Sequence, residues 1–350
     1  MSATIADLTA DRVFYRDLES CDPSLPGLEA LREPLGLPAG LIPRKRELSY
    51  ARVALAIAEA AQAQRGGPPL RALLVIGDTE NDRLLAHYLN KLPDAPQAYG
   101  LIGEDRPVVP ESLIWDGPIA TATRWSLLHP WATELERRGV RWDRTALLID
   151  IDKTLLGPRG RGDGAIDDAR AEGALAVAGD LLGTTLDISL FRRIYAELCR
   201  KEWHGFTLDN QDYVVSTALL IASGTISYED LDIGVDSGEL PSFAALLDAV
   251  TPRVPAPLVA LHAELRERVA AGDPTPFKLF RRAEFISTVA RMGDGRLTLC
   301  GELFTLAERL IAAGALGMAT SDKPAESALP SPAQAAAGIL PLHRTPAKVI

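Results

Sequence analysis

The sequence predicts an α/β fold in which a doubly wound, Rossmann-like parallel sheet is interrupted by a helical insertion. Three observations support this prediction. Four short runs are almost wholly apolar, as strands are when helices cover both faces of a parallel sheet. Segments with helical periodicity alternate with these runs. The region from about Gly157 to Gly301 keeps the helical periodicity but lacks strand–helix alternation.

The four apolar runs are the expected strands. In chain order they are Ala72–Ile76, Ala98–Gly103, Ala146–Ile151 and Ala315–Thr320. The C-terminal segment, residues 338–350, is expected to supply an edge strand.

The helices of the expected α/β core show apolar residues at positions i, i+3, i+4 and i+7. Residues 47–64 carry Tyr50, Val53, Ala54 and Ile57 at this spacing, and residues 302–314 repeat it before Gly314 ends the helix. A third helix, within residues 126–139, is expected to lead back to the strand at 146–151.

The helical insertion is bounded by two glycine-rich segments that can serve as hinges, Gly157–Gly164 and residues 291–301. Between them, residues 187–203 and 258–270 are amphipathic helices. We therefore expect a discontinuous α/β core formed by residues 1–156 and 301–350, and a helical domain formed by residues 157–300.

Composition excludes several classes of protein. The chain has 350 residues, enough for two domains, and a net charge of −10, which disfavours binding to nucleic acid or anionic membranes. The same field repels phosphorylated metabolites, so a site for them needs local cations or a metal. Three widely spaced cysteines form no metal or redox motif and indicate reduced thiols in a cytoplasmic protein. No secretory signal and no membrane span is expected.

Two aspartates one residue apart stand at the end of the strand expected at 146–151. Residues i and i+2 of a strand point to the same side, so Asp150 and Asp152 would meet in one crevice at the carboxyl edge of the sheet. Two carboxylates this close require a cation or a shared proton, and Mg²⁺ prefers such oxygen ligands. The alternative is a pair of solvated loop acids.

The string LLIDIDKTLL around this pair resembles the first motif of the haloacid dehalogenase (HAD) superfamily, an apolar strand followed by DxDxT. The resemblance implies a HAD-type fold. It also implies that Asp150 is a nucleophile that forms an aspartyl-phosphate, that Asp152 is the general acid and base, and that Thr154 shapes the loop. Lys153 stands where this motif often has glycine.

The string LLVIGDTEND resembles the fourth motif of the superfamily, a strand followed by GDxxxD. The resemblance implies that Asp78 and Asp82, together with Asp150 and Asp152, bind Mg²⁺ or hold its water ligands. Alternatively, Asp78 caps a helix and Asp82 lies in its first turn.

Two further motifs are less specific. The end of the strand at 315–320 resembles the second motif, in which a hydroxyl binds the transferred phosphoryl group. Ser321 aligns better than Thr320. For the third motif, a cation beside the nucleophile, we choose Lys45, which precedes the helix at 47–64. The alternatives are Arg44, Arg46, Lys323 and Lys348.

The motifs do not follow the order usual in the superfamily. The third and fourth candidates precede the first, and only residues 322–350 follow Ser321. We therefore interpret the chain as circularly permuted, since a cut in an exposed loop is tolerated. The strands at 72–76 and 98–103 would then lie on one side of the catalytic strand, and the strand at 315–320 on the other.

The helical insertion follows the first motif, where the superfamily carries its C1-type cap. Five cations in the hinge and the insertion could meet an anionic substrate, or could lie on charged faces in solvent: Arg159, Arg161, Lys278, Arg281 and Arg282.

The resemblance implies a Mg²⁺-dependent phosphohydrolase acting on a small phosphorylated metabolite. The alternatives are a phosphomutase or a carbon–halogen hydrolase of the same superfamily, although Asp152 argues against the latter. A non-catalytic scaffold or binding protein that keeps the fold is an alternative of another class. The sequence identifies neither the substrate nor the oligomeric state.

Overall fold

The computed structural model describes residues 1–350 and divides them into two compact units. Residues 1–167 and 288–350 form an α/β unit, and Asp168–Ser287 form a helical unit. The helical unit is shorter than the segment 157–300 expected from the sequence. The flanking residues belong to the α/β unit because they pair there: Gly157 N–H donates to the carbonyl of Thr298 at 2.8 Å.

The centre of the α/β unit is a seven-stranded sheet with a parallel core. The order is β2–β8–β7–β3–β4–β6–β5, and β5 alone runs antiparallel to its neighbour. The bounds are β2 Val13–Phe14, β8 Leu316–Thr320, β7 Thr145–Asp150, β3 Ala72–Gly77, β4 Gln97–Gly103, β6 Ile119–Ala122 and β5 Leu113–Asp116. The four strands predicted from apolar runs are therefore confirmed, and they occupy four adjacent positions in the sheet.

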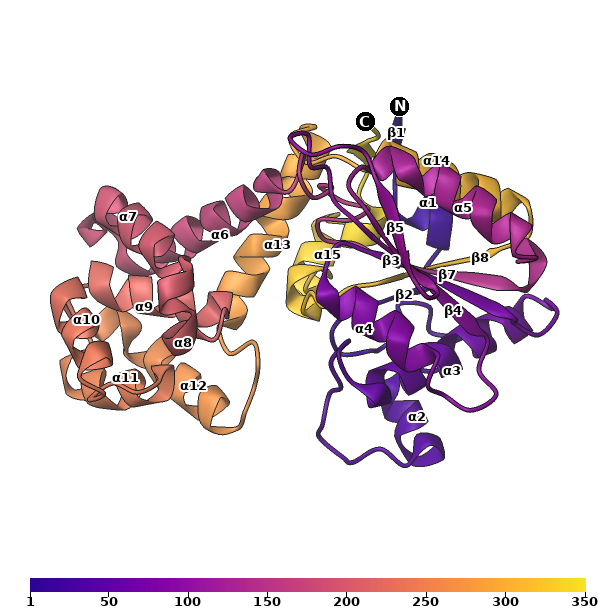
Figure 1. Cartoon of the computed structure of the whole chain (residues 1–350). Helices are drawn as coiled ribbons and strands as arrows, with labels where there is room; N and C mark the ends of the chain where they lie inside the picture. Colours follow the sequence, from indigo (N-terminus) through magenta and orange to yellow (C-terminus); the bar gives the residue numbers. More distant parts are fainter. The chain divides into compact units, whose positions relative to one another are not determined.

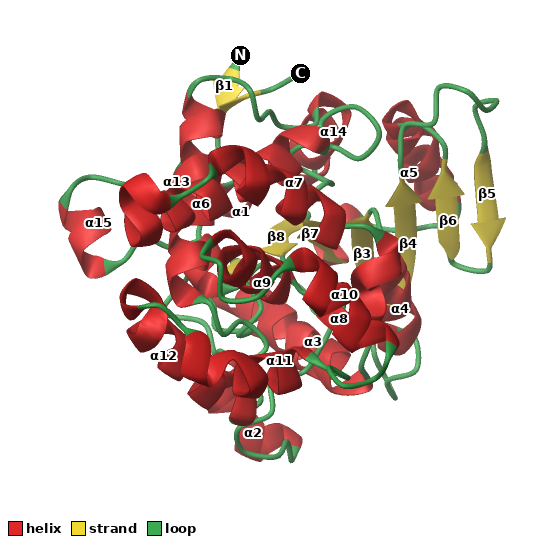
Figure 2. Ribbon diagram, turned by 90° about the vertical axis from the view of Figure 1, so that its left-hand side faces the viewer, coloured by secondary structure: helices red, strands yellow, loops and turns green.

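Three strands of the sheet that the sequence did not predict, β2, β5 and β6, are short. β5 and β6 form a hairpin at one edge of the sheet, and Figure 2 shows their arrows pointing in opposite directions. The two-residue loop between them is Gly117–Pro118, and Gly117 adopts the left-handed conformation with φ +58 that tight hairpin turns favour. β2 has only two residues, too few for any periodicity.

The expected C-terminal edge strand is wrong. Within residues 338–350 only Ala347–Lys348, β9, is a strand, and it pairs with β1, Ser2–Ala3, outside the main sheet. β2 takes the edge position beside β8 instead. The β1–β9 pair also places the two chain ends next to each other (Figure 1).

Helices cover both faces of the sheet, as the doubly wound class requires. Figure 1 shows one group above the sheet, α1 Ala6–Thr9, α5 Leu128–Arg137 and α14 Gly301–Ala312. The other group lies below it, α2 Leu28–Leu35, α3 Leu48–Gln64 and α4 Glu80–Leu89. A short helix, α15 Pro332–Ala336, lies near the C-terminus.

The strands are buried on both faces because alternate residues enter different cores. Leu73 and Val75 of β3 pack with Leu148 of β7 and Ile57 of α3 in one continuous cluster. Residues between them face the other layer. Gly317 of β8, for example, lies so close to α1 that an added Cβ would be 2.1 Å from the carbonyl oxygen of Leu8.

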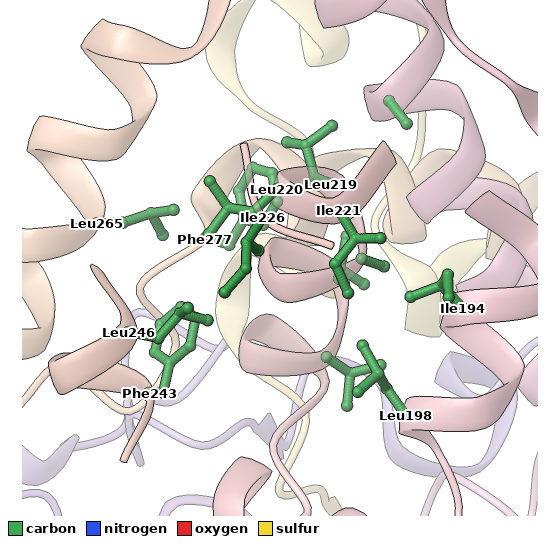
Figure 3. Packing of buried hydrophobic residues seen from close by; sticks show 14 of the residues in the cluster. Ile194, Leu198, Leu219, Leu220, Ile221, Ile226, Phe243, Leu246, Leu265 and Phe277 are labelled. Atoms are coloured by element: carbon green, nitrogen blue, oxygen red, sulfur yellow. The ribbon is translucent and has the colours of Figure 1, made fainter. Parts of the chain in front are cut away.

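The helical unit has its own hydrophobic core, part of which Figure 3 shows. At its centre lies α9, which is buried along most of its length and contributes Leu219, Leu220 and Ile221. The helices of this region are α6 Gly164–Leu182, α7 Ile188–Leu198, α8 His204–Thr207, α9 Gln211–Ala222, α10 Tyr228–Asp236, α11 Phe243–Val250, α12 Val259–Ala270 and α13 Lys278–Gly293. None of the helices combines the length and the apolar character that a membrane crossing requires.

Candidate functional site

Three aspartates converge at the carboxyl ends of two neighbouring strands. Asp78 follows β3 directly, Asp150 is the last residue of β7, and Asp82 lies in the first turn of α4. β3 and β7 run parallel, with Ile76 opposite Ile149, so both strands end at the same edge. One carboxylate oxygen from each aspartate lies within 4.8 Å of the others. We call Asp78, Asp82 and Asp150 the carboxylate cluster.

Lys45 neutralises part of this cluster. Its ammonium donates to Asp82 Oδ1 at 2.9 Å and forms an ion pair with Asp150. The side chain is only 2 % exposed, although it belongs to the segment preceding α3, more than 100 residues from Asp150. Of the five residues considered for the cation of the third motif, Lys45 is therefore the one in contact with Asp150.

Gly77 allows Asp82 to approach the end of β3. A Cβ on Gly77 would lie 2.2 Å from Asp82 Cγ and 2.4 Å from Asp82 Cβ, so no larger residue fits. Asp82 is held from the other side by Thr79, whose backbone N–H and hydroxyl donate to Asp82 Oδ2 at 3.2 and 2.8 Å. Thr79, not Asp78, is the N-cap of α4. Asp82 thus serves both the capping box and the carboxylate cluster.

Asp78 is fixed by residues that follow β7. The hydroxyl of Thr154 donates to Asp78 Oδ1 at 3.2 Å, and the guanidinium of Arg159 donates to Asp78 Oδ2 at 2.5 Å. Thr154, expected from the resemblance to shape the loop, therefore contacts a member of the carboxylate cluster. Arg159, weighed from the sequence as a substrate contact, is a partner of the cluster.

Burial determines the electrostatics of the cluster. Burial raises the pKa of Asp150 well above its usual range, and the neighbouring Asp82 and Asp78 carboxylates act in the same direction against Lys45. Burial also raises the pKa of Asp78, although Arg159 opposes it. Burial lowers the pKa of Lys45, but Asp150 and Asp82 outweigh it, so the pKa is raised and Lys45 remains charged.

The charges do not balance. Three carboxylates face two cations, Lys45 and Arg159, which leaves one negative charge in excess. Carboxylate oxygens are the ligands that hard divalent cations prefer, and a bound cation would remove the like-charge repulsion. The three carboxylates therefore fit a divalent cation that prefers oxygen ligands.

Asp152 lies past the end of β7, so the strand argument does not apply to it. β7 ends at Asp150, and the chain then turns, with Lys153 in the left-handed conformation at φ +63. The i, i+2 rule no longer applies past the end of the strand, and Asp152 is not a member of the carboxylate cluster. Its Oδ2 lies 3.1 Å from the ammonium of Lys323, a pairing that the sequence did not indicate.

The two hydroxyl candidates lie at the end of β8, next to β7. Thr320 pairs with Asp150 in the strand register and accepts a hydrogen bond from the Tyr50 hydroxyl at 3.3 Å. Ser321 follows it, is 1 % exposed, and its Oγ accepts from the backbone N–H of Lys323 at 3.1 Å. Tyr50 was predicted only as a helical core residue, because a contact across 270 positions leaves no local signal.

The remaining cations weighed for an anionic substrate have protein partners. Arg161 pairs with Glu302 and Asp105, and Lys278 pairs with Asp273 at 3.1 Å. Arg281 lies inside the helical unit, 8 % exposed, and pairs with buried carboxylates. Arg161, Lys278 and Arg281 are thus engaged with carboxylates of the protein, and Arg282 is likewise engaged with a neighbour.

No model of a known protein family matches the chain, and neither a curated protein nor a solved structure matches it.

Proposed function

We propose that the chain is a Mg²⁺-dependent phosphohydrolase of the HAD type with permuted motif order, acting on a small phosphorylated metabolite. One observation carries the proposal. Residues expected from four motif-like strings, far apart in the chain, occupy one edge of one sheet, with Lys45, Asp82 and Asp150 in direct contact.

The strand order supports the permuted arrangement. β3 and β4 lie on one side of β7, and β8 lies on the other, as the permutation requires. The paired chain ends also fit it, because joining neighbouring termini and opening a loop elsewhere keeps the same core. The helical unit enters the chain shortly after Thr154, where a C1-type cap is expected, and we assign it that role.

In the proposed reaction Asp150 attacks phosphorus in line with the leaving alcohol and becomes an aspartyl-phosphate. Asp152 gives a proton to the leaving oxygen, and then removes one from the water that hydrolyses the intermediate. Lys323 orients the Asp152 carboxylate through the 3.1 Å ion pair.

Charge stabilisation is shared among fixed groups. Lys45 and the Ser321 hydroxyl would offset the negative charge of the transferred phosphoryl group, since preorganised donors lower the barrier without reorganising. Asp78, Asp82 and Asp150 would hold Mg²⁺, which neutralises phosphoryl charge when bound. Asp82 also keeps Lys45 in place through the 2.9 Å contact.

The test is hydrolysis of an aryl phosphate in the presence of Mg²⁺, measured as released inorganic phosphate. Asp150→Asn is expected to abolish release while the variant stays folded, because the amide cannot act as the nucleophile. Asp116→Asn, on exposed β5, is the matched control and should keep the activity. Undiminished turnover by Asp150→Asn would remove the mechanism. Phosphoryl transfer to an acceptor without phosphate release would identify a mutase.

A further inference from the structure

A cavity of about 240 Å³ lies at the amino ends of the sheet strands, whereas the carboxylate cluster lies at their carboxyl ends. Its wall is formed at the amino ends of three adjacent strands, where Arg71 N–H donates to the Arg144 carbonyl at 2.8 Å and Gln97 N–H donates to the Arg71 carbonyl at 3.0 Å. These residues precede or begin β3, β7 and β4. We call this cavity the arginine pocket, and its polar lining comprises Arg71, Arg138, Arg141, Arg144, Gln97 and Tyr99.

The arginine pocket carries an excess of positive charge. Arg138 pairs with Glu134 at 3.1 Å, and Arg141 pairs with Asp143 at 3.1 Å. Arg71 and Arg144 have no ion pair, so two of the four guanidinium charges are uncompensated. The lining contains no acid. In a chain of net charge −10 such a concentration of cations is a local exception.

Arg144 supplies a second, independent observation. Its Nε is buried and has no hydrogen-bond partner. A buried donor without an acceptor is costly, and native proteins satisfy nearly all of them. The Arg144 guanidinium thus lines the pocket without a protein acceptor, and arginine is suited to phosphate because its planar fork binds two oxygens at once.

The pocket is separate from the carboxylate cluster. Arg144 precedes the first residue of β7, and Asp150 is the last residue of that strand. A six-residue strand spans about 20 Å at the usual rise per residue. A small ligand therefore cannot touch both ends.

We propose that the arginine pocket binds a small polyanion bearing two linked phosphate groups, of the pyrophosphate or bisphosphate class. The size fits this class, because pockets for drug-sized ligands begin at about 300 Å³ and this cavity is smaller. Two uncompensated guanidinium groups match a ligand with at least two negative charges. The proposal does not depend on the chemistry assigned to Asp150.

Calorimetric titration with pyrophosphate tests the proposal. The full chain is titrated in the presence of a chelator, so that no divalent cation occupies the carboxylate cluster. Arg71→Gln and Arg144→Gln are each expected to weaken binding about tenfold to one hundredfold, since a hydrogen bond to a charged group contributes that much. Arg137→Gln is the matched control, because Arg137 is exposed and does not line the pocket. It should bind as the wild type does.

Three results of the pyrophosphate titration would overturn the proposal. They are absence of pyrophosphate binding by the wild type, equal weakening by Arg137→Gln, and loss of binding in Asp150→Asn with retention in Arg71→Gln. Citrate is titrated in parallel, and tighter binding of citrate would refute the phosphate class. Thermal unfolding without pyrophosphate checks that each variant is folded. Unfolding with pyrophosphate checks binding, because a ligand that binds the native state raises the melting temperature. Arg71 is exposed, so its variant serves if Arg144→Gln fails to fold.

Discussion

Replacing Lys45 with methionine is expected to destabilise the α/β unit by about 3–5 kcal/mol, the usual cost of removing one partner from a buried ion pair. Lys45 is 2 % exposed and contacts both Asp82 and Asp150. Without its charge, the carboxylate cluster would retain only Arg159, which pairs with Asp78. Methionine is unbranched and fills irregular space, so the cavity contribution should be small.

Asp150→Asn provides the contrasting change. It removes one of three like charges while Lys45 keeps its 2.9 Å contact with Asp82. We expect the free energy of unfolding to change by less than about 1.5 kcal/mol, the range of an ordinary hydrogen bond. The difference in size between the effects of Lys45→Met and Asp150→Asn follows from the excess negative charge of the carboxylate cluster.

The assay is urea denaturation in the presence of a chelator, followed by tryptophan fluorescence. Four of the five tryptophans belong to the α/β unit and Trp203 to the helical unit, so a Trp203→Phe background reports the α/β unit alone. Lys91→Met, at an exposed position, is the control and should stay within about 0.5 kcal/mol of the wild type. If Lys45→Met unfolds at the same urea concentration as Lys91→Met, the electrostatic account of the cluster is wrong.

Four further outcomes are expected. Gly77→Ala should lower the free energy of unfolding by about 1–3 kcal/mol through overpacking against Asp82, and equal stability in urea would contradict the close approach. Arg281→Met should cost about 3–5 kcal/mol in the helical unit, where its carboxylate partners are buried, as read from Trp203 fluorescence. Burial lowers the pKa of His343, so the unfolded state binds more protons than the native state near that pKa. Stability should therefore fall as the pH drops below about 6.5. A series of melting temperatures measured against pH should be flatter for His343→Gln than for the wild type. Burial raises the pKa of Cys300 to about 12, so alkylation at pH 8 followed by mass spectrometry should leave it unmodified until the protein unfolds.

The central strands could be predicted from the sequence because burial on both faces leaves a local trace. Each of β3, β4, β7 and β8 is an apolar run long enough to be recognised. β2 has two residues, and its place beside β8 depends on a pairing of Phe14 with Thr320 across the whole chain. Such a pairing has no local signal, so the sequence indicates an edge strand only within residues 338–350.

The candidate site shows the same limit. Asp78 and Asp150 could be located because each follows a recognisable strand. The position of Asp152 could not, since it depends on where β7 ends and how the chain turns at Lys153. The partners of these acids, Arg159 and Lys323, come from loops whose spacing carries no information about contact.

Titration of the chelator-treated protein with Mg²⁺ tests the central claim most directly. If Asp78, Asp82 and Asp150 share one divalent ion, calorimetry should show one site per chain in the wild type and in Asp116→Asn. Asp78→Asn should lose that site, because the cluster then keeps only two carboxylates. Absence of Mg²⁺ binding by the folded wild type, or unchanged binding by Asp78→Asn, would contradict the assignment of these acids to a catalytic metal centre.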